Sequence, residues 1–248
     1  MHIRRKLFLH VVSSLGLALE LSVGLALALP PAACFASQEA AASGASVQGD
    51  DAPAGSQTAT ITFTKIFKSS YPEYVQVKVN EAGAGTFDIR QLDESANPQQ
   101  LNVGPELAQK LFRLAGELHD FQGVNLEAHR RIANLGQKTF RYDKGSESYE
   151  VTFNYTENDP ANQLLNIFEG LSREEGDISD LKRTMRYDPL GVNDVLMQVQ
   201  SDYKQKLLPE PSQLLPALDA IAKNDQIINI ARDKARNLAG QIRTERTD

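Results

Sequence analysis

Two histidines beside carboxylates are the residues of this chain best suited to acid–base or metal chemistry. They occur in Glu117-Leu118-His119-Asp120 and in Glu127-Ala128-His129. Imidazole and carboxylate groups bind zinc and transfer protons. Residues two apart on a helix do not share a face, and the H-E-x-x-H spacing of zinc hydrolases is absent. We therefore predict solvent-exposed histidines, no metal, no cofactor and no catalytic residue.

A hydrolase is the enzymatic alternative, because hydrolases can assemble a site from residues far apart in the sequence. In that case His119 or His129 would serve as the general base of a periplasmic enzyme. The G-x-S-x-G motif of an activated serine is absent from the chain, so the sequence names no nucleophile.

A basic cluster interleaved with aromatic residues lies between residues 129 and 144. Cations beside aromatic rings can bind a sugar, a nucleotide or single-stranded nucleic acid. Phe140 and Tyr142 follow the buried phase of a strand, however, so a solvated strand face explains most of the cluster. If the protein has a binding site, we expect it to use His129, Arg130, Arg131, Arg141 and Tyr142.

The acidic segment at residues 173–180 has the composition of a calcium-binding loop. It lacks the D-x-D-x-D-G order and the distal bidentate glutamate of such a loop. Gly170 and Gly176 also favour a bend or a break in the surrounding helix. We therefore interpret the segment as an exposed helix break and not as a metal site.

Alternation of apolar and polar residues predicts five β-strands. Residues 60–67, 74–80 and 86–90 form a meander, and residues 139–142 and 149–155 form a hairpin. Each strand has one apolar side, which must be covered. The predicted fold class is therefore α+β, with an antiparallel sheet of about five strands covered by helices.

Helical periodicity predicts a helix between the two groups of strands. It begins at Pro105, with Gly104 as its N-cap, and ends near Phe121. Residues 125–135 are expected to form a short second helix. Residues 59–158 therefore make up a mainly β part with one or two helices.

The chain is predicted to be all helical from residue 159 to residue 244. Asp159 is the expected N-cap of the first of these helices, because a proline follows it. Asp225 is the expected cap of the last helix. We expect this helical part to pack on the sheet and to belong to the same domain.

The first 36 residues have the pattern of a secretory signal peptide. Basic residues 4–6 precede an apolar run from Leu7 to Leu29, and small residues follow up to Ala36. We predict cleavage after Ala36 and a protein that is periplasmic or secreted. Twin-arginine export, lipidation of Cys34 and retention of the apolar run as a membrane anchor are the alternatives. Glu20, inside the apolar run, disfavours a permanent span.

Residues 37–58 are rich in Ala, Ser and Gly, which predicts a disordered tether. Residues 1–36 carry three of the 26 basic and one of the 32 acidic residues, so the remainder has a net charge of −8. That charge disfavours nucleic acid and anionic lipid as partners. Membrane association is expected only if the signal is retained or Cys34 is lipidated. Cys34 is the only cysteine, so no disulfide can form within the chain.

Three motifs have the composition of strands and turns: Lys138-Thr139-Phe140-Arg141-Tyr142, Phe153-Asn154-Tyr155-Thr156 and Tyr187-Asp188-Pro189-Leu190-Gly191. On these motifs the chain resembles a family of exported bacterial proteins of the acidobacterial type whose function is unknown. The resemblance extends over most of residues 60–243. It implies export, and it implies no reaction and no catalytic residue.

These observations lead us to expect a non-enzymatic binding or interaction domain outside the cytoplasm. Its partner would be a protein or a small molecule that the sequence does not identify. Besides the hydrolase, the remaining alternative is a structural module that self-associates through its C-terminal helices. Ile227, Ile228 and Ile230 offer more apolar surface than one helical stripe requires.

Overall fold

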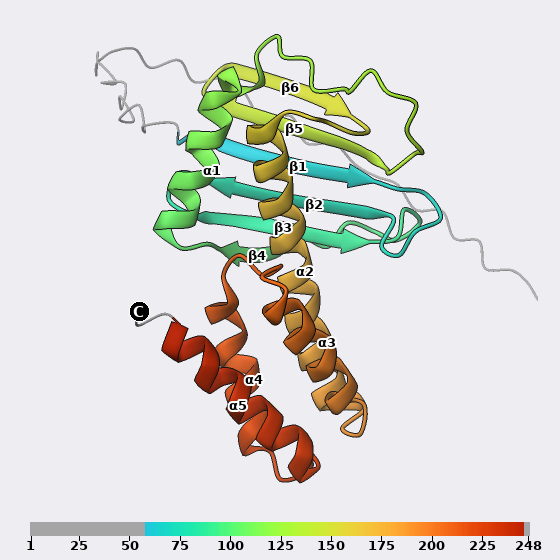
Figure 1. Ribbon diagram of the computed structural model, residues 1–248, viewed down its shortest axis with the longest axis vertical. Helices are drawn as coiled ribbons and strands as arrows, with labels where there is room; N and C mark the ends of the chain where they lie inside the picture. Colours follow the sequence, from blue (N-terminus) through green and yellow to red (C-terminus); the bar gives the residue numbers. More distant parts are fainter. Residues whose placement is uncertain (1–57, 246–248) are drawn as a thin grey trace, which may run out of the picture. The chain divides into compact units, whose positions relative to one another are not determined.

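The computed structural model describes residues 58–245 (Figure 1). The predicted signal peptide, Cys34 and the predicted tether up to residue 57 lie outside the described residues. Within residues 58–245, no helix combines the length and the apolar character needed to cross a bilayer.

Six antiparallel strands form one open sheet, which confirms the α+β class and adds one strand to the predicted five. In spatial order they are β4 (Gln99–Asn102), β3 (Ala84–Arg90), β2 (Tyr74–Asn80), β1 (Thr60–Ile66), β5 (Gln137–Lys144) and β6 (Glu147–Phe153). The sequence does not predict β4, because this strand has four residues and only Leu101 among them is buried. Such a strand is too short to show an alternating pattern.

One face of the sheet is apolar and lies against helices. Phe63 of β1 is paired with a valine of β2 and with Phe140 of β5, and all three side chains are fully buried. The ring of Phe140 lies among the rings of Phe63, Phe121, Phe153 and Phe168, at centroid distances of 5.3 to 6.1 Å. Such aromatic contacts add to the stabilisation from burial.

The helix α1 (Pro105–Glu117) begins at the predicted residue, directly after Gly104. Its buried side chains lie on one face, as the sequence periodicity predicts. The 3₁₀ turn η1 (His119–Phe121) follows and places Phe121 in the core. Figure 1 shows α1 and the first half of α2 on the same face of the sheet.

Residues 122–136 contain no helix, so the prediction of a short helix over residues 125–135 is wrong. Contacts with other segments satisfy the backbone of this loop instead. The Oδ1 atom of Asn154 accepts the N–H of Leu135 at 2.7 Å. The buried ammonium of Lys138 donates to three carbonyl oxygens, including that of Leu135. These partners satisfy backbone polar groups that a helix would otherwise pair, so the segment can remain an irregular loop.

The helix α2 (Asp159–Tyr187) is continuous over 29 residues, so no break occurs at Gly170 or Gly176. Its N-cap is Asn158, one residue before the predicted Asp159. At Gly170 a Cβ atom would lie 2.7 Å from the ring of Pro209, so this glycine allows the segment after α3 to approach the helix closely.

Three further helices and a 3₁₀ turn follow: α3 (Val192–Lys204), η2 (Pro211–Leu214), α4 (Leu215–Lys223) and α5 (Asn229–Glu245). The elements α3, η2 and α4 contact α2, and α5 packs against α3 and α4. Together with the end of α2 they form a second hydrophobic core. The last helix begins at Asn229, so Asp225 does not cap it. Figure 1 shows that α2 runs from the sheet into this helical part.

Candidate functional site

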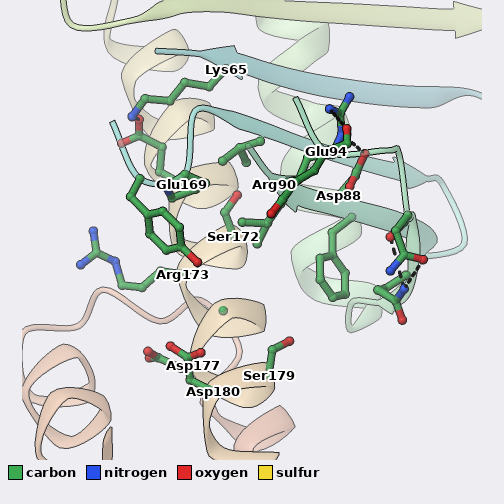
Figure 2. A pocket seen from close by; sticks show the side chains of 18 of the residues that line it. Lys65, Asp88, Arg90, Glu94, Glu169, Ser172, Arg173, Asp177, Ser179 and Asp180 are labelled. Carbon is green, nitrogen blue, oxygen red and sulfur yellow. Dashed lines mark hydrogen bonds and ion pairs between the residues drawn. The ribbon is translucent and has the colours of Figure 1, made fainter. Parts of the chain in front are cut away.

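A groove of about 960 Å³ lies between the sheet and α2 (Figure 2). Strands β1 to β3 and the loop after β3 form one wall, and residues 169–180 of α2 form the other. This volume is within the range of about 300–1,000 Å³ that is usual for ligand sites. A second hollow, of about 590 Å³, lies beside α1 and is lined by fewer residues.

The floor of the groove is apolar. Phe63, Val75, Phe87 and Ile89 contribute to it from three adjacent strands. The ring of Phe63 stacks on that of Phe168 of α2, with the ring centroids 5.4 Å apart. This contact holds α2 against the sheet and leaves an apolar surface on which part of a ligand could be buried.

Two ion pairs lie on the walls of the groove (Figure 2). Lys65 Nζ is 2.7 Å from Glu169 Oε1, so this pair joins β1 to α2. Arg90 Nε is 3.0 Å from Asp88 Oδ2, and its guanidinium lies 4.3 Å from the centre of the Tyr74 ring. Because both cations already have carboxylate partners, neither is available as an unpaired anion-binding group.

Asp177 of α2 also lines the groove, and its carboxylate lacks a full set of partners. The residue is 9% exposed, and its buried Oδ2 atom has no hydrogen-bond partner within residues 58–245. Burial and the neighbouring Asp202 carboxylate of α3 raise the pKa of Asp177 to about 7, although Arg173 opposes this change. The Arg173 guanidinium is itself 3.6 Å from Asp202. Asp177 can therefore change its charge near neutral pH.

A second buried carboxylate, Glu174, lies one turn earlier on α2 and outside the groove lining. Its Oε2 atom accepts the backbone N–H of Glu210 at 3.0 Å. Its Oε1 atom has no partner among the described residues. Burial raises the pKa of Glu174 to about 8, with added repulsion from Glu210 and from neighbouring carboxylates of α2. The expected exposed helix break at 173–180 is therefore wrong, because this segment is helical and its first carboxylates are buried.

None of the five predicted binding residues lines the groove. His129, Arg130 and Arg131 are exposed in the loop before β5, where Arg130 pairs with Glu157. Arg141 is exposed on β5 and pairs with Asp143. Tyr142, the next residue, is only 7% exposed, in the core. Because consecutive strand residues point to opposite faces, the structure does not bring Arg141 and Tyr142 onto one surface.

His119 and His129 are exposed, and neither side chain forms a hydrogen bond or an ion pair within residues 58–245. The described part of the chain also holds no group of three or more potential metal-ligating side chains. No histidine lines the groove, and the Ser172 hydroxyl there donates to the Phe168 carbonyl oxygen. The arrangement of the groove can therefore recognise charge and apolar surface, and it holds no serine–histidine pair.

Two sequence patterns could have indicated this groove, and both depend on the positions of charged residues within a strand or a helix. Lys65 continues the inward phase of Ile61 and Phe63, so it places a charge on the apolar side of a strand. On α2, Glu169, Arg173 and Asp180 recur at helical spacing and mark a polar stripe. Asp202 gives no such signal, because only the packing of α3 brings it near Asp177.

The chain was compared with models of protein families and with curated proteins, and neither comparison found a match.

Proposed function

We propose that this protein is a non-enzymatic binding module that acts outside the cytoplasm, and that the groove between the sheet and α2 holds its ligand. The observation that carries the proposal is Asp177, a buried carboxylate with one unpartnered oxygen that lines a groove of about 960 Å³. A buried carboxylate without a full set of partners is costly, and a ligand in the groove would offset this cost at the part of Asp177 that the groove exposes. The signal-peptide pattern of residues 1–36 supports the extracytoplasmic location.

Two features of the lining favour binding over catalysis. Lys65 and Arg90 are engaged in ion pairs, which limits their use as acids or activated nucleophiles. The groove also combines an apolar floor with a few charged groups on its walls, as ligand-binding sites usually do.

The groove can be blocked with little risk to the fold by Gly176→Leu. Gly176 lines the groove, and a Cβ atom there would meet no atom within 4 Å. Replacing a helical glycine with leucine should also stabilise the helix by roughly 0.5–1 kcal/mol, because leucine has the higher helix propensity. Gly240→Leu is the matched control, because Gly240 lies in α5 and its Cβ position is equally open.

The test is a fluorescence titration of the full chain with Nile red, a neutral apolar dye. We expect Gly176→Leu to weaken dye binding at least tenfold and Gly240→Leu to leave it unchanged. Mass spectrometry of the natively purified chain should also find co-purified molecules that Gly176→Leu no longer retains. Equal dye binding by both variants would contradict the proposal.

Self-association through the helical part is a second candidate function, favoured by its exposed apolar side chains. The larger ones are Tyr187, Leu190, Met197, Leu207, Ile228 and Ile230. Such side chains can serve an interface when they form a continuous patch. Light scattering should then give a mass that rises with concentration, and Ile230→Lys should prevent the rise. A constant monomer mass would argue against this candidate.

A further inference from the structure

We infer that the groove binds a cationic amphiphile, whose ammonium or guanidinium group lies against Asp177 and whose apolar body covers Val75, Phe87 and Ile89. This inference rests on the proposed role of the groove and adds the chemical class of its ligand. Amines and basic peptide side chains share this chemistry, and the experiment below separates them.

The charges of the lining favour a cation over an anion. Each of the three basic residues there has a carboxylate neighbour: Lys65 has Glu169, Arg90 has Asp88, and Arg173 has Asp202. The lining also contains Glu94, Asp177 and Asp180. The groove therefore has an excess of negative charge, which would repel an anionic ligand and attract a cationic one.

Among these carboxylates, Asp177 is the one with a buried, unpartnered oxygen. Asp180 pairs with Arg183, and the Glu94 carboxylate accepts the backbone N–H of Gln91 at 2.8 Å. Asp177 instead experiences repulsion from the nearby Asp202 carboxylate of α3. An ammonium or guanidinium group in the groove would lie against the part of Asp177 that the groove exposes, and its positive charge would offset this repulsion.

An organic cation fits these residues better than a metal ion does. The described residues provide no cluster of three ligating side chains, so a metal would lack its coordination shell. The apolar floor, by contrast, matches the hydrocarbon part of an amphiphile. Val75 and Phe87 are 9% and 8% exposed, so their remaining surface would be covered by such a ligand.

The experiment uses the absence of tryptophan from the chain. Ser95→Trp places a single fluorophore on the exposed loop that lines the groove, and Ser146→Trp places one on the exposed β5–β6 turn as a matched control. The probes are phenethylammonium, 2-phenylethanol and 3-phenylpropionate, which have similar apolar bodies and different charges. A fourth probe, acetyl-Phe-Lys-amide, presents the ammonium on a peptide side chain.

With Ser95→Trp at pH 8, we expect phenethylammonium or the lysine peptide to bind at least tenfold more tightly than 2-phenylethanol. The propionate should bind more weakly than the alcohol. Tighter binding of the free amine would identify a small-molecule ligand, and tighter binding of the peptide a peptide ligand. The Ser146→Trp fluorescence should not change with any probe.

Adding Asp177→Asn to the Ser95→Trp chain should abolish the preference for the cation, so that the amine and the alcohol bind with about equal affinity. Asp233 is an exposed carboxylate of α5 that pairs with Arg236. Asp233→Asn removes the same charge far from the groove lining and should preserve the preference for the cation. Equal affinity for amine and alcohol, or no binding of either cation, would overturn the inference. If the alcohol binds in these cases and Gly176→Leu abolishes its binding, the proposed function of the groove still stands. Binding that survives Gly176→Leu would overturn both.

Discussion

The Glu210 carboxylate caps the start of α1 from a segment 106 residues later in the chain. Its Oε1 atom accepts the backbone N–H of Gly104 at 2.6 Å, and its Oε2 atom accepts from Gln213. Gly104 has no side chain with which to cap the helix itself. The negative charge also interacts favourably with the positive end of the α1 dipole. One side chain therefore joins the linker after α3 to the helix that covers the sheet.

Removing this cap should destabilise the protein. We expect Glu210→Ala to lower the free energy of unfolding by about 1–2 kcal/mol, because the Gly104 N–H loses its acceptor. Glu210→Gln keeps an acceptor and should recover at least half of the loss. Urea unfolding at pH 7 measures both. Glu117→Ala, which removes an exposed i,i+4 ion pair of α1, is the control and should cost no more than about 0.5 kcal/mol. A Glu210→Ala chain as stable as this control would refute the capping role.

Glu174 should make the protein less stable as the pH rises. The folded state keeps the Glu174 proton up to about pH 8, whereas the unfolded chain releases it near the ordinary pKa of 4.5. Between these two values the folded state binds more protons, so its stability falls with increasing pH. Glu174→Gln removes this group and retains an acceptor for the Glu210 N–H.

The check is the free energy of unfolding at pH 5 and at pH 9. The loss of stability between the two should be about 4 kcal/mol smaller in Glu174→Gln than in the unaltered chain. The exposed substitution Glu147→Gln should leave the pH dependence as it is. The same loss in all three proteins would show that Glu174 ionises as it does in the unfolded chain.

Binding of a cationic ligand should strengthen as Asp177 loses its proton. With the pKa near 7, about a tenth of Asp177 is ionised at pH 6 and about nine-tenths at pH 8. We therefore expect phenethylammonium to bind roughly tenfold more tightly at pH 8 than at pH 6. The charged groups that act on Asp177 are Asp202 of α3 and Arg173 and Asp180 of α2. In Asp177→Asn the affinity should not depend on pH over this range, and a dependence that persists there would point to another group.

Lys138 should hold the loop before β5 in place. Its ammonium donates to the carbonyl oxygens of Leu135, Gly136 and Asn154 at 3.2, 3.1 and 2.8 Å. Lys138→Met keeps the apolar part of the side chain and removes these donors, which should cost about 2 kcal/mol. Hydrogen exchange of residues 122–136 should become faster, whereas the exposed Lys144→Met should have no effect on it. Unchanged exchange in Lys138→Met would show that other contacts hold the loop.

The alternating strands and the periodic helices could be predicted from the sequence because local patterns determine them. Ile61 and Phe63 share the buried phase of β1, and Leu111 and Leu114 share the buried face of α1. The short strand β4 could not be predicted, because it depends on pairing with β3 more than on its own residues. The loop at 122–136 shows the same dependence, since its hydrogen-bond partners are Lys138 of β5 and Asn154 and Tyr155, which directly follow β6.

The candidate site was harder to predict than the fold, because a charged residue gives no local sign of being buried. Glu174, Asp177 and Asp202 have the composition of a solvated helix surface, yet they are 0%, 9% and 2% exposed. Lys138 likewise belongs to a basic cluster in the sequence and is buried in the structure. Arg141 and Tyr142 are adjacent in the sequence and lie on opposite faces of one strand.

The sequence by itself determined the fold class, the single cysteine and most of the helices and strands, because side-chain periodicity acts within each segment. Only the tertiary structure decided that α2 continues past the sheet, that a groove remains between them, and that Asp202 of α3 lies close enough to Asp177 to raise its pKa. The free energy of a carboxylate depends on the charges and the solvent around it, and these are set by segments far away in the chain.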